Sequence, residues 1–488
     1  MSAPRRWFKF VAASVLLSVL FAACGSTATP AVTSNATTTS APAAIAATAA
    51  PAAAIATTSA PAAAITTAAP AAVTTAPAAA ATTQEPITLT VWAEGNTVTT
   101  MDSAPDTKGK LGKFLIQQFE KEHPGVTVVL QDQGWDEVLR QNLTNALLAG
   151  TAPDVIVGEN FFQQFAAQGA LVPLDDVIGD IKPNLIPGTI QAATYNGKTY
   201  GISAMTGVFG FERNCKVVTD AGLNCDNPPK TWDELLSQAK TLTDKGAGNY
   251  YGYTLQGPVG FSVGGIFRVA VYMAQSDAPM CKDNCTTPFF NNPKAIPVLE
   301  FLRKINKFTP PGLTFNADEG QVYTQLFQNK SAYQIAGSWH TAWAKENKCP
   351  DCRYSPIPIP AGGHDASVIV GNVIYTVLKQ SKHPAMAAEW VKFLARDGVQ
   401  DLVYPALGRL PATRSALTKL RPSVSTADQA FIDVLLNSKD LQVLPQWQKN
   451  PQLLWTAYND MLTKLLTTDT PVQQLVDEAQ KAAEAALK

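Results

Sequence analysis

Net charge is almost absent from this chain of 488 residues, in which 38 lysines and arginines stand against 39 aspartates and glutamates, for a formal charge of -1. Residues of both signs are mixed along the sequence instead of gathering in patches. Nucleic-acid binding and attachment to a membrane through a polybasic patch both need clustered lysines and arginines. Both function classes are therefore excluded.

Histidine is scarce as well, with four in the whole chain. Three of them have no other candidate metal ligand at a suitable spacing: His123, His340 and His383. A zinc site built from His364 with Cys349 and Cys352 lacks a convincing fourth ligand. We therefore expect neither a metal nor a cofactor.

The apolar run near the start, residues 10–23, is too short to cross a membrane as a helix. It follows three basic residues, Arg5, Arg6 and Lys9, and this order is typical of an export signal. The arginine pair partly resembles a twin-arginine signal. Because Lys9 takes the place of the leucine expected there, general secretion is favoured.

Small residues precede Cys24 in the stretch LFAAC, which resembles a bacterial lipobox except that Phe21 replaces the usual aliphatic residue. We expect residues 1–23 to be a lipoprotein signal peptide and Cys24 to be the lipidated first residue of the mature protein. Residues 24–86 are almost entirely alanine, threonine, proline and serine, which offer few large apolar groups for a core. Their prolines interrupt helical hydrogen bonding, so they predict a disordered tether to the outer face of the bacterial cell membrane.

Six further cysteines fall into three local pairs, and outside the cytosol such an even set is more simply explained by disulfides than by metal ligands. The expected pairs are Cys215 with Cys225, Cys281 with Cys285, and Cys349 with Cys352, although the sequence does not prove this connectivity. The last pair forms a C-x-x-C motif, as in thioredoxin-type redox sites. It lacks the preceding aromatic residue and the βαβ start of those sites, so a structural disulfide is favoured.

Patterns of strand and helix alternate from residue 87 onward. The first strands are expected at residues 87–92, 126–130 and 153–158, with helices at 111–122 and 135–149 between them. The apolar faces of these helices are expected to contain Phe114, Leu115 and Phe119 in the first and Val138, Leu139, Leu143 and Leu147 in the second. This alternation predicts an α/β fold with a mostly parallel sheet.

The rest of the chain continues the pattern. An Asn-Gly pair at 196–197 predicts a hairpin, and Thr231 with Glu234 predicts a capping box for a helix that runs through Thr243. Other expected elements are strands at 250–255 and 369–378, a helix that starts at Pro384, and a last helix at 472–487. About 400 residues exceed the size of a single core, so two lobes are expected.

The stretch AGSWHTAW, residues 336–343, places two tryptophans one helical turn apart. Residues 331–336 alternate like a half-buried strand, and Ser338 is expected to cap a helix that has Trp339 in its first turn. Trp339 would then lie at the carboxyl end of a strand, where ligands collect in open α/β sheets. The alternative is that both tryptophans simply fill the core.

A dozen motifs between residues 89 and 417 occur in the order found in family 1 extracellular solute-binding proteins of ABC importers, and the chain resembles that family. They are LTVW, KFLIQQFEKEHPGVTVVL, LLAGTAPDVIVGE, GALVPLDD, YNGKTYGIS, GFERN, NPPKTWDELLSQAKTL, LFQNKSAYQIAGSW, YSPIPIPAGG, VGNVIYTV, HPAMAAEWVKFL and GRLPATRSA. The segment 93–111 is longer than is usual in the family, and many members lack the six cysteines.

The resemblance implies a two-lobed, type II periplasmic-binding-protein fold with a cleft between the lobes. One lobe would hold residues 87–206 plus 374–418, and the other 207–373 plus 419–488. Residues 205–214 and 370–377 would form the hinge that closes the lobes over the ligand. The implied partners of this monomer are a sugar and the membrane permease subunits of an ABC importer.

The resemblance also implies the ligand-binding residues. The stacking tryptophan of the family falls on Trp339, its acidic contact on Glu159, and its GRLP-like turn on Arg409. A sugar ring offers an apolar face to an aromatic ring and a rim of hydroxyls to planar polar groups. The rim would be bound by Glu159, Asn160, Asn372, Arg409 and Glu94, with Trp343 as a backing layer.

Two other function classes remain open. An exported glycoside hydrolase would also present tryptophans and carboxylates to a sugar, although the lipid tether and the hinge segments favour capture without catalysis. A binding protein could instead take a polyamine, a peptide or iron, which would require an acidic aromatic box or spaced tyrosine, histidine and carboxylate ligands. The near-neutral charge and Trp339 favour a neutral di- or oligosaccharide.

Overall fold

The computed structural model describes residues 85–93, 111–134, 136–158, 162–258, 263–316, 318–437, 441–445 and 447–488. The chain divides into two units, Met1–Ala80 and Ala81–Lys488, and all the described residues belong to the second. The predicted signal peptide, Cys24 and almost all of the predicted tether lie outside the described residues. Three of the expected ligand residues lie outside them as well: Glu94, Glu159 and Asn160.

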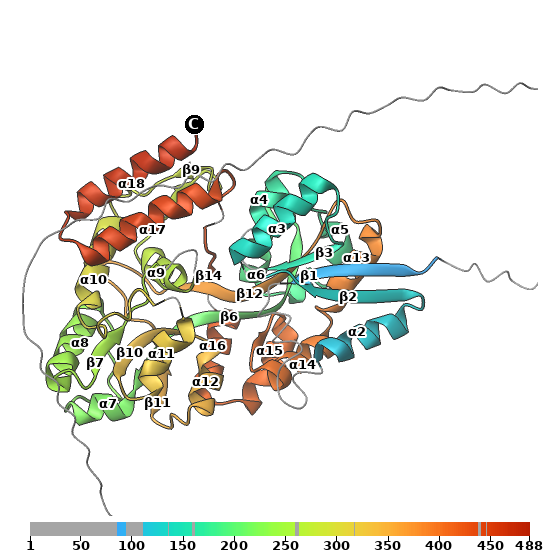
Figure 1. The fold of residues 1–488 in the computed structure, drawn as a ribbon. Helices are drawn as coiled ribbons and strands as arrows, with labels where there is room; N and C mark the ends of the chain where they lie inside the picture. Colours follow the sequence, from blue (N-terminus) through green and yellow to red (C-terminus); the bar gives the residue numbers. More distant parts are fainter. Residues whose placement is uncertain are drawn as a thin grey trace, which may run out of the picture. The chain divides into compact units, whose positions relative to one another are not determined.

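Within the described residues, ten strands form one sheet (Figure 1). Seven follow one another in the order β2 (Val126–Asp132), β1 (Ile87–Ala93), β3 (Val155–Gly158), β12 (Ser367–Val377), β6 (Gly201–Asn214), β10 (Ser331–Gly337) and β7 (Tyr251–Thr254). Three short strands extend this path, with β11 (Cys352–Ser355) and β13 (Leu410–Pro411) beside β6 and β14 (Leu441–Gln442) beside β12. Two small hairpins stand apart from the sheet, β4 (Thr194–Tyr195) with β5 (Lys198–Thr199) and β8 (Cys281–Lys282) with β9 (Thr287–Pro288).

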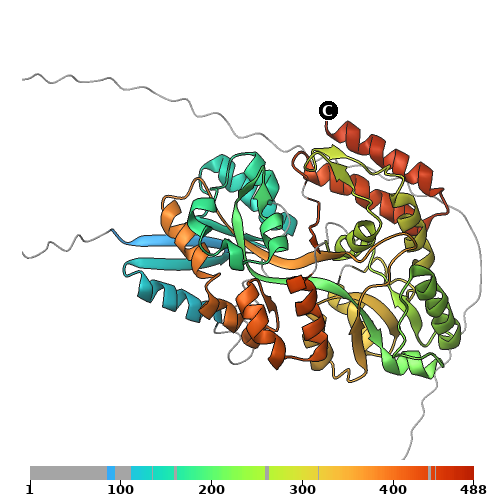
Figure 2. The ribbon, with the colours of Figure 1, turned by 180° about the vertical axis from the view of Figure 1, so that it is seen from behind.

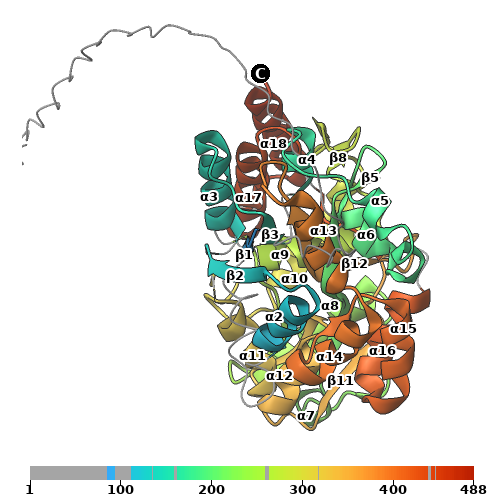
Figure 3. The ribbon, with the colours of Figure 1, turned by 90° about the vertical axis from the view of Figure 1, so that its right-hand side faces the viewer.

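Helices lie on both sides of the strands. In the views of Figures 1 and 3, α3, α17 and α18 lie above the strands, and α14, α15 and α16 lie below them. The α-helices are α2 (Leu111–Glu122), α3 (Asp136–Ala149), α4 (Phe162–Ala167), α5 (Asp175–Ile178), α6 (Pro187–Ala192), α7 (Cys215–Asp220), α8 (Trp232–Gly246), α9 (Val263–Gln275), α10 (Ala295–Asn306), α11 (Glu319–Phe327), α12 (His340–Glu346), α13 (Pro384–Phe393), α14 (Asp397–Leu407), α15 (Arg414–Leu420), α16 (Thr426–Asn437), α17 (Pro451–Thr467) and α18 (Val472–Ala486). Two short 3₁₀ helices are η2 (Lys182–Asn184) and η3 (Arg421–Ser423).

The strand directions confirm the α/β class, but the sheet is mixed, so the prediction of a mostly parallel sheet is wrong. β1 is parallel to β2 and β3, and β10 is parallel to β7, as the alternation of strands and helices predicts. In the middle of the sheet, β12 is antiparallel to β3 and β6, and β6 is antiparallel to β10. Apart from the short β14, which is parallel to β12, the parallel pairs lie toward the edges, and the two long strands β6 and β12 join them.

Two predicted helix faces are wrong at single residues. α2 has the predicted bounds, but it buries Leu111, Leu115 and Phe119, while Phe114 is 50% exposed. In α3, Val138 is 56% exposed although Leu139 is buried. The reason is the same in both helices. Residues four apart in the sequence lie on one face, whereas the residue just before a buried one points about 100° away from that face.

The predicted hairpin turn and the predicted start of α8 agree more closely with the structure than the helix faces do. Asn196 and Gly197 both have positive φ, 46° and 75°, and join β4 to β5 as the predicted hairpin turn. Thr231 Oγ1 accepts a hydrogen bond from the Glu234 amide at 3.2 Å and starts α8. The Glu234 carboxylate accepts from the amide of Lys230, one residue earlier than in a standard capping box, and α8 continues to Gly246.

The hydrophobic residues form two large cores. One lies among β1, β2, β3, α2, α13 and α14, around side chains such as Leu89, Phe119 and Trp390. The other lies among β7, β10, α8, α9, α10, α17 and α18, which Figure 2 shows together at the opposite end of β6. A smaller core joins Val208 of β6 and Ile369 of β12 to Phe431 of α16. The predicted lobe boundary at residues 206 and 207 falls inside β6 and stays a prediction.

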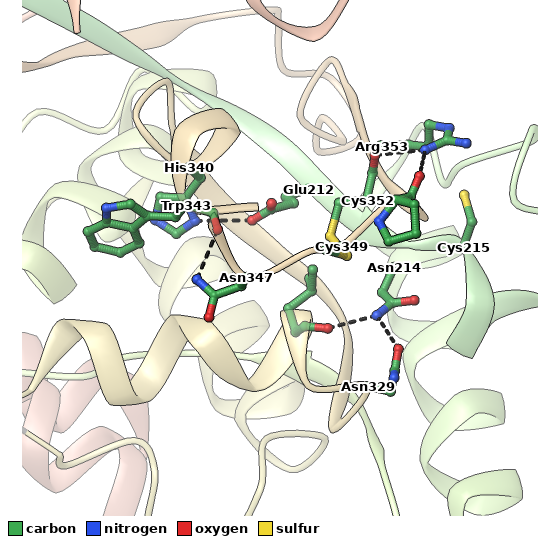
Figure 4. The surroundings of a disulfide bond; sticks show 12 residues. Glu212, Asn214, Cys215, Asn329, His340, Trp343, Asn347, Cys349, Cys352 and Arg353 are labelled. Atoms are coloured by element: carbon green, nitrogen blue, oxygen red, sulfur yellow. Dashed lines mark hydrogen bonds and ion pairs between the residues drawn. A yellow bond between two sulfur atoms is a disulfide. The ribbon is translucent and has the colours of Figure 1, made fainter. Parts of the chain in front are cut away.

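The three predicted disulfides are confirmed. Cys215 is bonded to Cys225, Cys281 to Cys285 and Cys349 to Cys352, with Cα separations of 5.3, 4.9 and 5.5 Å. Each closes a loop of at most 10 residues, so each links neighbouring parts of the chain. Cys349 and Cys352 follow α12 directly, which places this bond close to the AGSWHTAW stretch (Figure 4).

Candidate functional site

The strand before the predicted site is more buried than its alternating sequence suggests. All seven residues of β10 are buried, so the prediction of a half-buried strand is wrong. The reason is its position between β6 and β7, with packed side chains on both faces. Its polar residues are hydrogen-bonded inside the protein, as shown by the 2.7 Å bond between the hydroxyls of Thr254 and Ser331.

The start of α12 also differs from the prediction. Trp339 is the N-cap residue, and no side chain caps the helix, so the predicted cap by Ser338 is wrong. The Ser338 hydroxyl instead faces β6, where a Cβ built on Gly207 would lie 2.6 Å from its oxygen. The Ser338 amide donates to the Val208 carbonyl at 3.0 Å. These contacts hold the residue that follows β10 against β6.

Trp339 and Arg409 lie together. The Arg409 guanidinium carbon is 4.8 Å from the centre of the indole ring, within the range of a cation–π contact. A Cβ on Gly371 would lie 3.5 Å from the indole, and one on Gly337 would lie 2.2 Å from it. The indole therefore rests against two backbone segments that carry no side chain, and Trp339 is 8% exposed.

Asn372 follows Gly371 on β12 and is 3% exposed. Gly371 has a φ of 62°, a left-handed conformation that favours glycine, and the pairing of β12 with β6 shifts register between Val370 and Val373. The structure thus brings Gly371, the neighbour of Asn372, close to Trp339 and Arg409. Asn372, Trp339 and Arg409 are three of the predicted ligand residues. The irregular pairing occurs within a predicted hinge segment.

Glu94, Glu159 and Asn160 are not among the described residues. In the sequence, Glu94 directly follows β1, and Glu159 directly follows β3. β1 and β3 are parallel neighbours, so their carboxyl ends lie at the same edge of the sheet. The roles of these three residues stay predictions.

Trp343 has a different environment from Trp339. Its side chain is partly buried and packs against the second large core and against Leu326, Phe327 and Ala344. Its ring centre is 4.9 Å from that of His340. Figure 4 shows both rings on α12. This position agrees with a backing layer.

A fully buried carboxylate lies behind this helix, and the sequence analysis missed it. Glu212 and His340 both have 0% exposure, with His340 Nδ1 3.1 Å from Glu212 Oε2 (Figure 4). Gln334 donates to the same oxygen at 2.6 Å, and the Tyr354 hydroxyl donates to Oε1 at 2.5 Å. Burial and the adjacent Glu212 charge raise the pKa of Tyr354. The sequence offered one signal for this buried carboxylate, because Glu212 follows a largely apolar stretch of β6.

A second carboxylate that the sequence analysis missed connects α16 to α12 and α14. Asp428 of α16 is 4% exposed and accepts hydrogen bonds from three hydroxyls. The donors are Thr341 of α12 at 2.6 Å, Tyr404 of α14 at 2.8 Å and Ser425 at 2.7 Å. Thr341 lies two residues after Trp339, so this contact holds the start of α12 against α14 and α16.

In the described part of the chain, no group of three or more histidine, cysteine, aspartate or glutamate side chains could hold a metal ion. The described helices also include none that is long and apolar enough to cross a membrane.

Residues 103–401 match a known family, described as bacterial extracellular solute-binding protein. The chain belongs to this family. As a member of an extracellular family, this solute-binding protein is extracytoplasmic. The match includes the strands β2, β3, β6, β7, β10 and β12 and the helix α12.

Several named relatives are similar to this solute-binding protein. A binding protein of Brucella abortus (strain 2308) is 29% identical over 370 residues, 75% of this chain and 87% of that protein. The maltodextrin-binding protein MdxE of Bacillus subtilis is 22% identical over 76% of this chain and 85% of its own length. The diacetylchitobiose-binding protein DasA of Streptomyces coelicolor is 23% identical over 74% of this chain and 81% of its own length.

Solved structures show the same fold. The cyclic α-maltosyl-1,6-maltose-binding protein of Arthrobacter globiformis has a TM-score of 0.69 and 18% identity, covering 83% of this chain and 99% of that chain. A solute-binding protein of an ABC transporter from Thermotoga lettingae has a TM-score of 0.69 and 22% identity, covering 82% of this chain and 100% of its own. The solute-binding protein therefore has the two-lobed fold of periplasmic binding proteins.

Proposed function

We propose that this protein captures a sugar of two or more rings between its lobes and delivers it to an ABC importer. The contact between Trp339 and Arg409 carries the proposal, since it joins an aromatic face to a planar hydrogen-bond donor at the end of β10. Relatives named for maltodextrin and diacetylchitobiose support a sugar, although another relative, UgpB, is named for sn-glycerol-3-phosphate. The protein would bind the sugar without changing it.

The sugar has to reach an indole that is 8% exposed. We propose that Arg409 moves off the ring as the sugar stacks on it, and that the guanidinium then donates to the sugar hydroxyls. The lobes would rotate about β6 and β12, where Gly371 and the shifted register make the pairing irregular. A ligand shifts such an equilibrium only if it binds the closed form better, so it must touch both lobes.

Attachment to the membrane belongs to the same proposal. Residues 1–23 would be removed, and Cys24 would carry the lipid that keeps the protein near its importer. Mass spectrometry of membrane-extracted protein tests this directly, because an unmodified Cys24 in the mature chain contradicts the anchor.

A thermal-shift screen tests the binding function. The panel contains maltotriose, mannotriose, diacetylchitobiose and α-D-tagatose, with sn-glycerol-3-phosphate as the non-sugar. A compound that binds only the folded state stabilises it by about 2.7 kcal/mol at a concentration 100 times its Kd, which raises the Tm. We expect at least one oligosaccharide to raise the Tm and to be recovered intact. A hydrolysed sugar would favour the hydrolase, and a shift by the phosphate alone would contradict the sugar.

A further inference from the structure

Arg268 is a buried cation in the second large core, close to the start of α12. Its side chain is 3% exposed, and its Nε donates to the Ile335 carbonyl of β10 at 3.1 Å. Its guanidinium carbon lies 3.7 Å from the centre of the Tyr323 ring and 5.2 Å from that of Phe209. β10, α11 and β6 therefore fix this guanidinium from three sides.

The partner of Arg268 is Glu319, the first residue of α11. Arg268 Nη2 lies 2.9 Å from Glu319 Oε1, and the glutamate side chain is 34% exposed. Burial alone would raise the pKa of Glu319, but the charge and hydrogen bond of Arg268, with smaller contributions from His340 and Arg409, hold that pKa below its usual value. The pair thus presents an ionised carboxylate on the outer side of a fixed, buried cation.

Glu319 is linked to Trp339 through Arg268 and Phe209. The Phe209 ring centre is 6.2 Å from that of Trp339 and 5.2 Å from the Arg268 guanidinium carbon, and Arg268 is paired with Glu319. β7 and β10 are parallel, so their carboxyl ends share one edge of the sheet. α11 runs back to the start of β10, which places its first residue toward that edge.

We propose that Glu319 is a further specificity-determining residue, whose carboxylate accepts a hydrogen bond from a hydroxyl of the sugar stacked on Trp339. Arg268 would be the positioning residue that orients it. The inference rests on the proposed function and adds a contact that the sequence analysis did not predict. The bound sugar must carry a hydroxyl that extends from Trp339 toward α11.

A purely stabilising ion pair is the alternative. Burying a guanidinium is costly, and replacing a buried ion pair by apolar side chains of similar volume is often neutral or stabilising. A partly exposed carboxylate offsets little of that cost. The arrangement is therefore a poor way to stabilise the fold and a good way to hold one carboxylate in a fixed orientation.

Glu319→Gln tests the proposal, since it removes the charge and keeps the shape. The matched control is Asp175→Asn, because Asp175 is paired with Lys182 at 3.1 Å and is 36% exposed, but lies on α5. Both purified variants are titrated calorimetrically with the sugar of the screening panel that raises the wild-type Tm most. We expect Glu319→Gln to raise Kd about 10- to 100-fold, as for loss of a hydrogen bond to a charged group. Asp175→Asn should leave Kd unchanged.

Monodeoxy analogues of the same sugar separate contact from support. If Glu319 binds one hydroxyl, the analogue lacking that hydroxyl should bind the wild type and Glu319→Gln equally, while the other analogues keep the difference. An unchanged Kd for Glu319→Gln, or an equal loss with every analogue, overturns the inference while the proposed function stands. A wild-type chain that binds no member of the panel overturns the proposed function and this inference with it.

Discussion

Replacing Trp339 by alanine should raise the Kd for the sugar thirtyfold to several hundredfold, a loss of about 2–4 kcal/mol of binding free energy. The indole supplies the flat apolar face on which the sugar ring stacks, and alanine offers none. Because Trp339 is also 8% exposed and packed against Phe209, the variant should lose stability as well. Calorimetric titration of the folded protein measures the first effect, and thermal melting measures the second.

Two control variants separate these effects. Trp339→Phe keeps an aromatic face and most of the packing, so it should recover most of the stability and part of the affinity. Trp343→Ala removes a ring that packs against the core and lies 4.9 Å from His340, so it should lower the Tm with a smaller change in Kd. If Trp339→Ala melts early but its folded fraction binds the sugar with the wild-type Kd, then Trp339 is only a core residue.

Replacing Glu212 by alanine should lower the free energy of unfolding by about 3–5 kcal/mol, the usual loss when one partner of a buried pair is removed. The carboxylate is completely buried and accepts hydrogen bonds from Tyr354 and Gln334 beside His340. Alanine leaves those polar groups without their acceptor, and each unsatisfied group adds to the loss. Denaturant unfolding followed by circular dichroism measures the change.

Glu212→Gln is the control for this second prediction. Glutamine keeps the volume and one oxygen acceptor, so the loss of stability should be smaller than with alanine. The sugar Kd of folded Glu212→Ala should change less than that of Trp339→Ala, since Glu212 supports α12 from behind. A Glu212→Ala protein as stable as the wild type would contradict the assigned role of the buried carboxylate.

Features set by neighbouring residues could be predicted from the sequence. The bounds of α2 follow from local apolar spacing and from Pro124 and Gly125, which come just after the helix and end it. The hairpin follows from Asn196 and Gly197. The disulfide pairs were also predictable, because each links cysteines at most 10 residues apart. In each case the interacting residues are close in the chain, so the local sequence pattern is enough to predict the helix, the turn or the disulfide.

Features set by distant residues could not be predicted. Glu212 and His340 are 128 residues apart, and Arg268 and Glu319 are 51 apart, so only the folded sheet brings them together. Ser338 illustrates the same limit, since its hydroxyl faces Gly207 on β6 and not the helix that follows it. The position of Trp339 after a strand followed from the local pattern, and its role as the stacking ring followed from the resemblance to a family. Its contact with Arg409 required the structure.

A crystal structure of the chain with its sugar tests the central claim most directly. The account predicts a sugar ring within about 4.5 Å of the Trp339 indole, the contact distance for apolar groups. Arg409 should then bind the sugar rim, and the lobes should be closer together than in crystals without sugar. A sugar bound elsewhere, with the Trp339 indole still covered by Arg409, would contradict the account.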